Sequence, residues 1–254
     1  MRRLRHLSGQ HRTAATNRML GALLAFNAGA VNAGGFLVVA MYTSHMTGFA
    51  SLLADNLVLG NMRLVLGAIG VLLAFTAGAA ATAMLVNWAR QHGLRSEYAI
   101  PLLLEAVLLL VFGLMGATLG RQTPFAVPLT VLVLSFTMGL QNALVSKISS
   151  SQIRTTHMTG IVTDIGIELG KLFYWNRTAS PPESRVRANR IKLRLLGTLL
   201  GAFVAGGVVG AAGFKYIGFV WVVPLALLLL GLCMPPLYAD LLRILRRQTL
   251  HHGT

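Results

Sequence analysis

Acidic residues and cysteine are both scarce in this chain. Its 254 residues include seven Asp and Glu and one cysteine, and charged residues of both signs make up 11%. The single cysteine, Cys233, excludes an intramolecular disulfide. Soluble domains usually carry about 25% charged residues, whereas 55% of this chain is hydrophobic and its mean hydropathy is +0.67. The composition therefore indicates a membrane protein.

Six apolar runs are long enough to cross a bilayer as helices. About 20 helical residues are needed to span roughly 30 Å of hydrocarbon. The runs predict transmembrane helices near residues 19–41, 63–88, 98–119, 124–147, 193–213 and 217–238. We therefore expect an all-α polytopic protein whose main partner is the lipid bilayer.

The net charge of +15 would suit a nucleic-acid partner, but the basic residues gather at the ends of the chain and between spans. Six crossings place these segments on one side, which the positive-inside rule assigns to the cytoplasm. We predict a cytoplasmic tail at 1–18, a basic cytoplasmic loop at 172–192 and a second tail at 243–254. Such loops attract anionic lipid headgroups, and we expect no nucleic-acid partner.

The first seventeen residues are rich in Arg and contain no acid, as in some targeting signals. A long uninterrupted span follows them without a small-residue cleavage site. This arrangement favours a retained cytoplasmic tail.

One six-residue motif occurs twice. Thr-Ser-His-Met-Thr-Gly at 43–48 returns as Thr-Thr-His-Met-Thr-Gly at 155–160, and Gly-x-x-Asn-Ala precedes both copies, at 29–33 and 139–143. A short apolar segment follows each motif, at 45–60 and 157–171. As helices these segments would be roughly 22 Å long, below the usual spanning length. We predict two membrane repeats, 19–119 and 120–242, each with three spans and one half-helix.

The orientation of the repeats depends on the short helices. If these helices re-enter the membrane without crossing it, each repeat has an odd number of spans and the second repeat is inverted. Inverted repeats with broken helices place the binding sites of transporters near the bilayer midplane. The alternative is that the short helices cross, which gives eight crossings and parallel repeats. The distribution of Lys and Arg favours six crossings only slightly.

The repeated motifs resemble those of the YoaK-type family of small bacterial integral membrane proteins, a domain of unknown function. The resemblance covers about residues 18–245 and rests on Asn-Ala-Gly at 32–34, Ser-His-Met-Thr-Gly at 44–48, Gly-Leu-Gln-Asn-Ala at 139–143 and Thr-Thr-His-Met-Thr-Gly at 155–160. It implies a transporter-like protein of the bacterial inner membrane. It implies no substrate and no catalytic residue.

A helix that begins at each repeated turn would leave backbone N–H groups unpaired, and such helix ends bind anions. The expected caps are Thr47 and Thr159, and Gly48 and Gly160 would allow a ligand to approach the backbone. Imidazoles can also carry a proton near neutral pH. The alternative is that each histidine only locks its turn by bonding a carbonyl. The predicted binding residues of the two turns are His45, Thr47, Gly48, His157, Thr159 and Gly160.

Two asparagines, Asn32 and Asn142, lie in the helices that lead to the turns. Their amides are candidates to bind a solute. Alternatively they join membrane helices, as amides commonly do.

Acidic residues near the turns are candidates for proton or ion coupling. His157, Asp164, Glu168 and Lys171 share one helical stripe, and the first copy offers Asp55. The alternative for Glu168 is an ion pair with Lys171. A further acid, Glu105, lies in an otherwise apolar span and is either neutral and hydrogen-bonded inside the bundle or part of a pathway.

The pattern as a whole favours a secondary carrier for a small anionic solute, driven by protons or facilitative. We expect no enzyme, metal or cofactor, since the chain has neither His-Glu-x-x-His nor Gly-x-Ser-x-Gly. One alternative is a scaffold or regulator that transports nothing, and another is a haem held between the two histidines. The sequence leaves the oligomeric state open.

Overall fold

The computed structural model describes residues 14–39, 41–119, 126–149, 155–176 and 185–251. Every regular element in these ranges is helical, so the prediction of an all-α protein is confirmed for the described part of the chain. The predicted tail at 1–18 and the loop at 172–192 lie partly outside the described residues, as do residues 252–254 of the second tail.

Eight α-helices and one short 3-10 helix follow one another along the described chain. They are α2 (Ala14–Val39), α3 (Met46–Leu59), α4 (Met62–Gln91), α5 (Ala99–Leu119), α6 (Ala126–Ile148), α7 (Met158–Phe173), α8 (Arg190–Tyr216), η2 (Gly218–Trp221) and α9 (Val222–His251).

Six of these helices are long and apolar enough to span a membrane, as the sequence predicted. The chain is therefore a multi-pass membrane protein. The candidate spans agree with the predicted ones, although the last reaches Arg246 and not 238, and α9 continues to His251. The two predicted short helices are also present as α3 and α7, with 14 and 16 residues.

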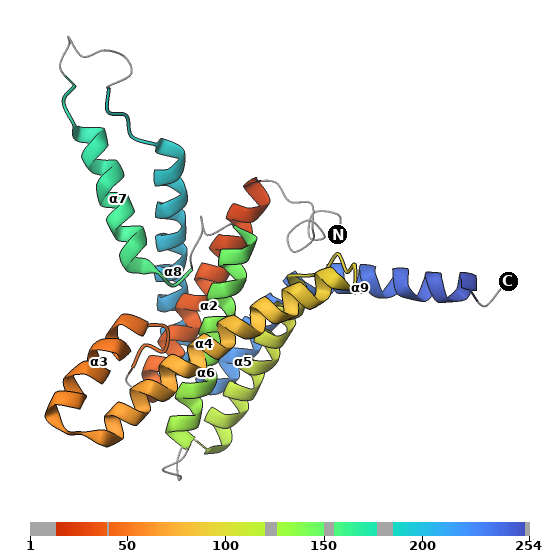
Figure 1. The fold of residues 1–254 in the computed structure, drawn as a ribbon, viewed down its shortest axis with the longest axis horizontal. Helices are drawn as coiled ribbons and strands as arrows, with labels where there is room; N and C mark the ends of the chain where they lie inside the picture. The colour runs from red at the N-terminus through yellow and green to blue at the C-terminus, as the bar shows by residue number, and fades with distance from the viewer. Residues whose placement is uncertain (1–13, 40, 120–125, 150–154, 177–184, 252–254) are drawn as a thin grey trace.

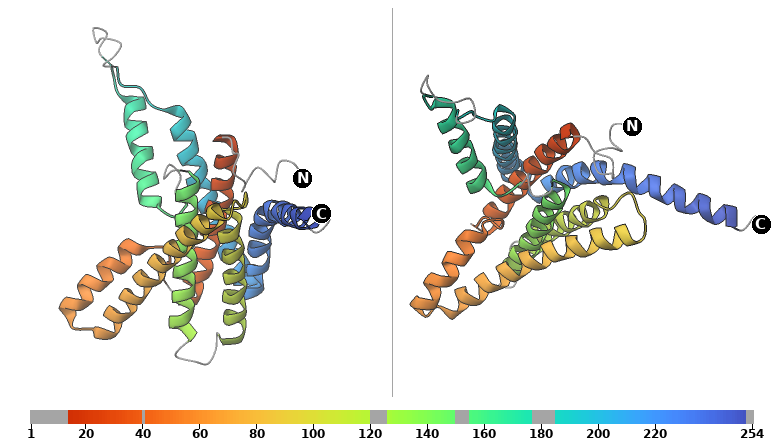
Figure 2. Two further views of the ribbon diagram at one scale, coloured as in Figure 1. Left: turned by 45° about the vertical axis from the view of Figure 1, so that its right-hand side comes forward. Right: turned by 45° about the horizontal axis from the view of Figure 1, so that its top comes forward.

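Each long helix of the first predicted half packs against a long helix of the second. α2 lies along α8, α4 along α6, and α5 along α9, while α2 also contacts α6. α3 packs on α4 and α7 packs on α8, so that two helical arms diverge from the centre (Figures 1 and 2). The three pairs of long helices therefore join the two halves into one bundle.

Glycines bring the paired helices into backbone contact. A β-carbon on Gly29 of α2 would overlap the carbonyl oxygen of Phe203 in α8, and one on Gly139 of α6 would overlap that of Phe75 in α4. Small residues permit such close approach between membrane helices. The two contacts occupy corresponding positions in the two halves, because Gly29 and Gly139 each begin a Gly-x-x-Asn-Ala pattern.

The contacts in the opposite direction match as well. A β-carbon on Gly206 of α8 would overlap the carbonyl oxygen of Phe26, and one on Gly78 of α4 would overlap that of Phe136. The α2–α8 and α4–α6 crossings therefore use the same pair of residue types at corresponding positions.

Asparagines begin the long helices that follow the two short ones. Gly60 is the C-cap of α3, and its φ of 71° is the left-handed conformation that glycine tolerates. The side chain of Asn61 then accepts a hydrogen bond from the Leu64 N–H at the start of α4. Asn189 caps α8 in the same way by accepting from the Lys192 N–H at 3.0 Å.

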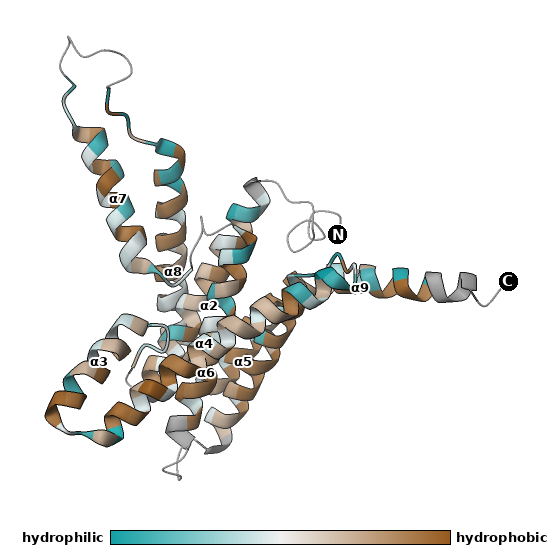
Figure 3. Cartoon of the chain, viewed as in Figure 1, coloured by the Kyte–Doolittle hydropathy of each residue, from teal (hydrophilic) through white to brown (hydrophobic). Residues whose placement is uncertain are grey.

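Large apolar side chains lie on the outer surface of the bundle. Leu66, Leu73 and Met84 of α4 are 64 to 65% exposed, and Val208 of α8 is 65% exposed. Figure 3 shows hydrophobic residues along most of α5, whereas the N-terminal ends of α2 and α8 are hydrophilic. A surface of this kind suits contact with lipid chains.

Candidate functional site

The repeated motif forms the turns that precede α3 and α7. Each helix begins at the methionine of the motif, with His45 and His157 as the N-cap residues. Neither cap makes a side-chain hydrogen bond to its helix. The expectation that Thr47 and Thr159 are the caps is therefore wrong, because both threonines already lie inside the first helical turn.

The glycine of each motif leaves room for the imidazole of the same motif. The Nδ1 atom of His45 lies 2.8 Å from the position that a β-carbon on Gly48 would occupy, and His157 stands over Gly160 in the same way. A side chain at either position would displace the ring. The space beside each glycine is thus filled by an imidazole and not left to a ligand.

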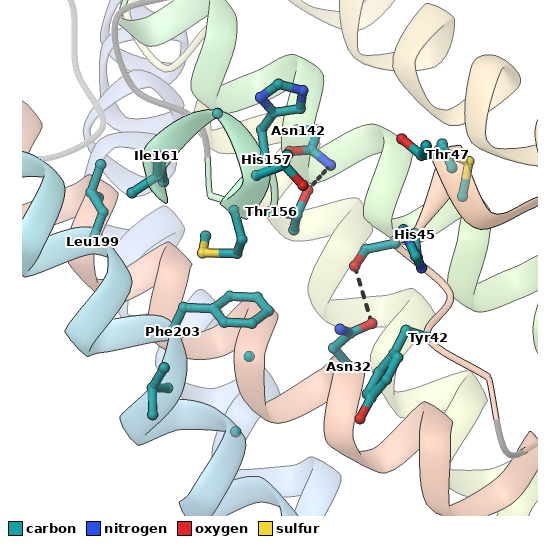
Figure 4. A pocket seen from close by; sticks show the side chains of 18 of the residues that line it. Asn32, Tyr42, His45, Thr47, Asn142, Thr156, His157, Ile161, Leu199 and Phe203 are labelled. Atoms are coloured by element: carbon teal, nitrogen blue, oxygen red, sulfur yellow. Dashed lines mark hydrogen bonds between the residues drawn. The ribbon is translucent and has the colours of Figure 1, made fainter. Parts of the chain in front are cut away.

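Two hydrogen bonds tie the turns to the helices that lead to them. The Ser44 hydroxyl donates to the Asn32 Oδ1 at 3.1 Å, and the Asn142 amide donates to the Thr156 hydroxyl (Figure 4). These bonds join each asparagine to the turn that follows its own helix and not to another membrane helix, and the partner is the residue directly before each histidine. Ser44 and Thr156 were not among the predicted site residues, although a hydroxyl residue stands before the histidine in both copies of the motif.

A second pair of hydroxyl residues lies buried behind the turns. Thr43 and Thr155 are both 0% exposed, and neither Oγ1 atom has a hydrogen-bond partner among the described residues. Buried hydroxyl groups usually find a partner. Both turns therefore hold an unsatisfied hydroxyl at the same position of the motif.

Both turns line one wide, open cavity of about 1490 Å³. His45 stands at one side, before α3, and His157 at the other, before α7 (Figure 4). Many lining residues come as matched pairs from the two halves: Asn32 and Asn142, Ser44 and Thr156, His45 and His157, Met46 and Met158, Thr47 and Thr159, Phe75 and Phe203.

The N-terminal ends of α3 and α7 reach this cavity. Within the described residues, the N–H groups of Thr47, Gly48, Thr159 and Gly160 have no hydrogen-bond acceptor. Unpaired N–H groups at a helix start carry partial positive charge. Among the described residues, the cavity lining contains no Lys or Arg, so the N–H groups of Thr47, Thr159 and Gly160 and the two imidazoles are its positive features there.

The predicted coupling acids occupy different places. Asp164 lines the cavity and forms an ion pair with Lys192 of α8 at 3.2 Å. Glu168 is buried away from the lining and pairs with Lys171 at 2.9 Å, which is the alternative that the sequence allowed. Asp55 is exposed on α3 and does not line the cavity.

Glu168 also joins α7 to the start of α8. Its Oε2 accepts a hydrogen bond of 2.7 Å from the Asn189 N–H, while its Oε1 accepts from Lys171. The pKa of the Glu168 carboxyl is lowered, first by the Lys171 hydrogen bond and then by the Asn189 N–H. The ionised carboxylate thus holds the α7–α8 arm together.

The structure brings eight of the eleven predicted site residues to the cavity: His45, Thr47, His157, Thr159, Gly160, Asn32, Asn142 and Asp164. Gly48, Asp55 and Glu168 are not part of the lining. The aromatic lining residues Phe75, Phe203 and Tyr42 were not predicted, because their apolar surroundings in the sequence do not distinguish them from lipid-facing residues. Among the described residues, no group of three or more His, Cys, Asp or Glu could hold a metal ion.

Comparison with known proteins gives one match. A family model described as "Protein of unknown function (DUF1275)" matches residues 20–234, which include both turns and all six candidate spans in whole or in part. No curated protein and no solved structure matches the chain.

Proposed function

The chain belongs to the DUF1275 family, whose description assigns no activity, and from the geometry of the cavity we propose that it is a secondary carrier for a small anionic solute. The single observation that carries this proposal is the position of the two repeated turns. They come from separate halves of the chain and line one open cavity with His45 and His157. A site built from two half-helix starts is the arrangement that many carriers use.

Inverted repeats are part of the proposal. The matched crossings support a twofold relation between the halves, and inversion follows if α3 and α7 re-enter the membrane: α2 meets α8 as α6 meets α4, and α5 meets α9, its counterpart in the other half. A twofold relation between the halves produces this pattern of pairs. The matched contacts of Gly29 and Gly139 with the Phe203 and Phe75 carbonyls give the same relation at the level of residues.

We place the protein in a bacterial inner membrane with six crossings, both termini in the cytoplasm, and α3 and α7 as re-entrant half-helices. The exposed Arg187 and Arg190 near the start of α8 and Arg243 near the end of α9 support this orientation. A cysteine at Asn61, in the α3–α4 turn, tests it. A labelling reagent that cannot cross the membrane should reach this cysteine from outside the cell. Labelling only from the cytoplasmic side would favour eight crossings.

The preference for an anion follows from the groups that face the cavity. Helix N-termini with unpaired N–H groups attract negative charge, and each imidazole can add a positive charge when protonated. Proton coupling through His45 or His157 is therefore part of the proposal. Asp164 does not oppose it strongly, because Lys192 balances the charge of its carboxylate.

Flux measurements on purified protein in liposomes test the carrier. We expect a pH gradient to drive uptake of at least one member of a panel of small inorganic and carboxylate anions. His45→Ala and His157→Ala should each lower that uptake at least tenfold. His92→Ala is the matched control, because His92 lies at the end of α4, bonds the Trp88 carbonyl and does not line the cavity.

If the His45→Ala and His157→Ala variants fold and their uptake is unchanged, the carrier site does not include these histidines. The anion preference has its own test, since proline at Thr47 or Thr159 removes one helix-start N–H. Proline fits the first turn of a helix, so each variant should fold and bind the transported anion more weakly. Equal anion affinity would exclude binding by the helix ends.

A structural role for the motif is the second candidate, and local contacts favour it. The Asn32–Ser44 and Asn142–Thr156 hydrogen bonds and the imidazoles over Gly48 and Gly160 would stabilise the turns without any solute. A scaffold of this kind predicts that the histidine variants lose stability while no anion in the panel crosses the membrane. A visible absorption spectrum of the purified protein tests the haem hypothesis, and a spectrum without haem bands would exclude it.

A further inference from the structure

One carboxyl group lies in the centre of the bundle, apart from the cavity. Glu105 is in the first half of α5 and is 0% exposed. Its helical neighbours Leu102, Ala106 and Leu109 are also 0% exposed and apolar. Glu105 is therefore enclosed by the bundle and does not face lipid or solvent.

The surroundings of Glu105 offer few hydrogen bonds. The Asn27 amide of α2 donates to Glu105 Oε1 at 3.3 Å. Glu105 Oε2 and Asn27 Oδ1 are buried, and among the described residues neither has a donor. No Lys, Arg or His in the described part of the chain lies within ion-pair distance of Glu105. The cluster thus has more acceptors than donors and no positive charge.

Other titratable groups do not supply that charge. From α9, the buried Cys233 thiol lies near enough to Glu105 for an electrostatic interaction, and it donates to the Leu230 carbonyl. The charged residue of α6 is Lys147, which lies in the last turn of that helix and bonds Asn87. From α4, Arg90 pairs with Glu97, which precedes α5. Arg90 and Lys147 are therefore directed elsewhere, and among the described residues no ion pair includes Glu105.

An ionised carboxylate is very unfavourable when it is buried without a counterion. A proton removes the negative charge and adds the donor that the cluster lacks. The Asn27 amide can turn to present either its N–H or its carbonyl oxygen, so it can bond both forms of the acid. We propose that Glu105 is a proton-binding site in the membrane core that holds its proton at neutral pH.

The Glu105 site is connected to the cavity of the proposed carrier through α2. Asn27 lies on α2, the helix that carries the cavity residue Asn32. A proton that binds Glu105 and leaves it again would be the coupling ion of transport, in addition to any proton on the histidines. This role rests on the proposed function, whereas proton binding itself does not.

Infrared difference spectroscopy tests the proton directly, without any solute. The full chain is labelled with ¹³C-carboxyl glutamate and reconstituted in lipid, and spectra are recorded from neutral to alkaline pH. We expect a carboxylic acid C=O band at neutral pH that shifts with the label and with exchange into D₂O. The label limits the assignment to Glu97, Glu105, Glu168 and Glu183.

Variants assign the band to one residue. Glu105→Gln should abolish it, and Asn27→Leu should shift it to higher frequency because the acid loses its hydrogen-bond partner. Glu97→Gln is the control that leaves it in place, since Glu97 pairs with Arg90. If Glu105→Gln does not fold, the acid band of the labelled unmutated protein and its shift in Asn27→Leu still test whether Glu105 holds the proton.

Each outcome supports or overturns the proposal. Absence of a label-sensitive acid band at neutral pH, or its survival in folded Glu105→Gln, would overturn proton binding. A band that never declines as the pH rises would leave proton binding in place and overturn the coupling role. Failure of the flux measurements alone would overturn the carrier and leave the infrared result intact.

Discussion

Gly139 of α6 packs directly on the backbone carbonyl of Phe75 in α4, and no β-carbon fits between them. The same contact joins Gly29 of α2 to Phe203 of α8. The two phenylalanine side chains line the cavity, so the glycine contacts also fix the walls of the candidate site. Close helix packing and the shape of the cavity therefore depend on the same residues.

Gly139→Ala should destabilise the protein by about 1–3 kcal/mol, because the added carbon forces α4 and α6 apart. Unfolding equilibria in mixed detergent micelles containing dodecyl sulfate measure this loss. Gly201→Ala in α8 is the matched control, since a β-carbon there meets nothing within 4 Å. The control should change stability by no more than about 0.5 kcal/mol. Equal stability of the two variants would contradict the crossing described here.

The helices were predictable from the sequence, but these contacts were not. Six long apolar runs define six spans because crossing the bilayer requires a minimum length. The glycines were visible too, as the first residues of the repeated Gly-x-x-Asn-Ala pattern. Their partners were not visible, because Phe75 and Phe203 are far from Gly139 and Gly29 in sequence and present only backbone at the contact. Local patterns carry no information about such partners.

Gly160→Ala should disturb the turn through His157 rather than through the backbone. The added methyl group would displace the imidazole, which is the far end of a flexible side chain. In a His157→Ala background the same substitution should be neutral or slightly stabilising, since alanine favours a helix. A double-mutant cycle on unfolding free energies should therefore give a coupling of about 0.5–3 kcal/mol. Additive effects would mean that the ring does not stand over Gly160.

Thr156→Val tests the hydrogen bond that ties the second turn to α6. The substitution keeps the shape of the side chain and removes the acceptor of the Asn142 amide. We expect a loss of about 0.5–1.5 kcal/mol in unfolding free energy, the usual net value of one hydrogen bond. Thr198→Val in α8 is the control, because its hydroxyl bonds only the carbonyl of Arg194 in its own helix. A loss no larger than that of the control would show that the bond does not hold the turn.

Most residues of the candidate site could be predicted from the sequence, whereas the contacts that these residues make could not. Duplication singled out His45 and His157, and both line the cavity. The sequence could not show that the imidazole fills the space at its own glycine, since ring orientation depends on the backbone angles at the cap. It also gave Thr47 and Thr159 the capping role. The N-cap residue stands directly before the first helical residue, and in both turns it is the histidine, two positions before the threonine.

The α7–α8 arm should lose stability in acid through Glu168. Its pKa lies below the ordinary glutamate value of 4.5, because Lys171 and the Asn189 N–H favour the ionised form. For a lowered pKa, the stabilisation is fully present above the unfolded value and disappears as the pH falls through the folded one. Hydrogen exchange in α7, corrected for the intrinsic rate, should therefore accelerate below about pH 4.5. Glu168→Gln should exchange faster at neutral pH and lose this acid dependence. Asp55→Asn, on the exposed side of α3, should keep the profile of the unmutated protein, and an unchanged acid transition in Glu168→Gln would assign it to another group.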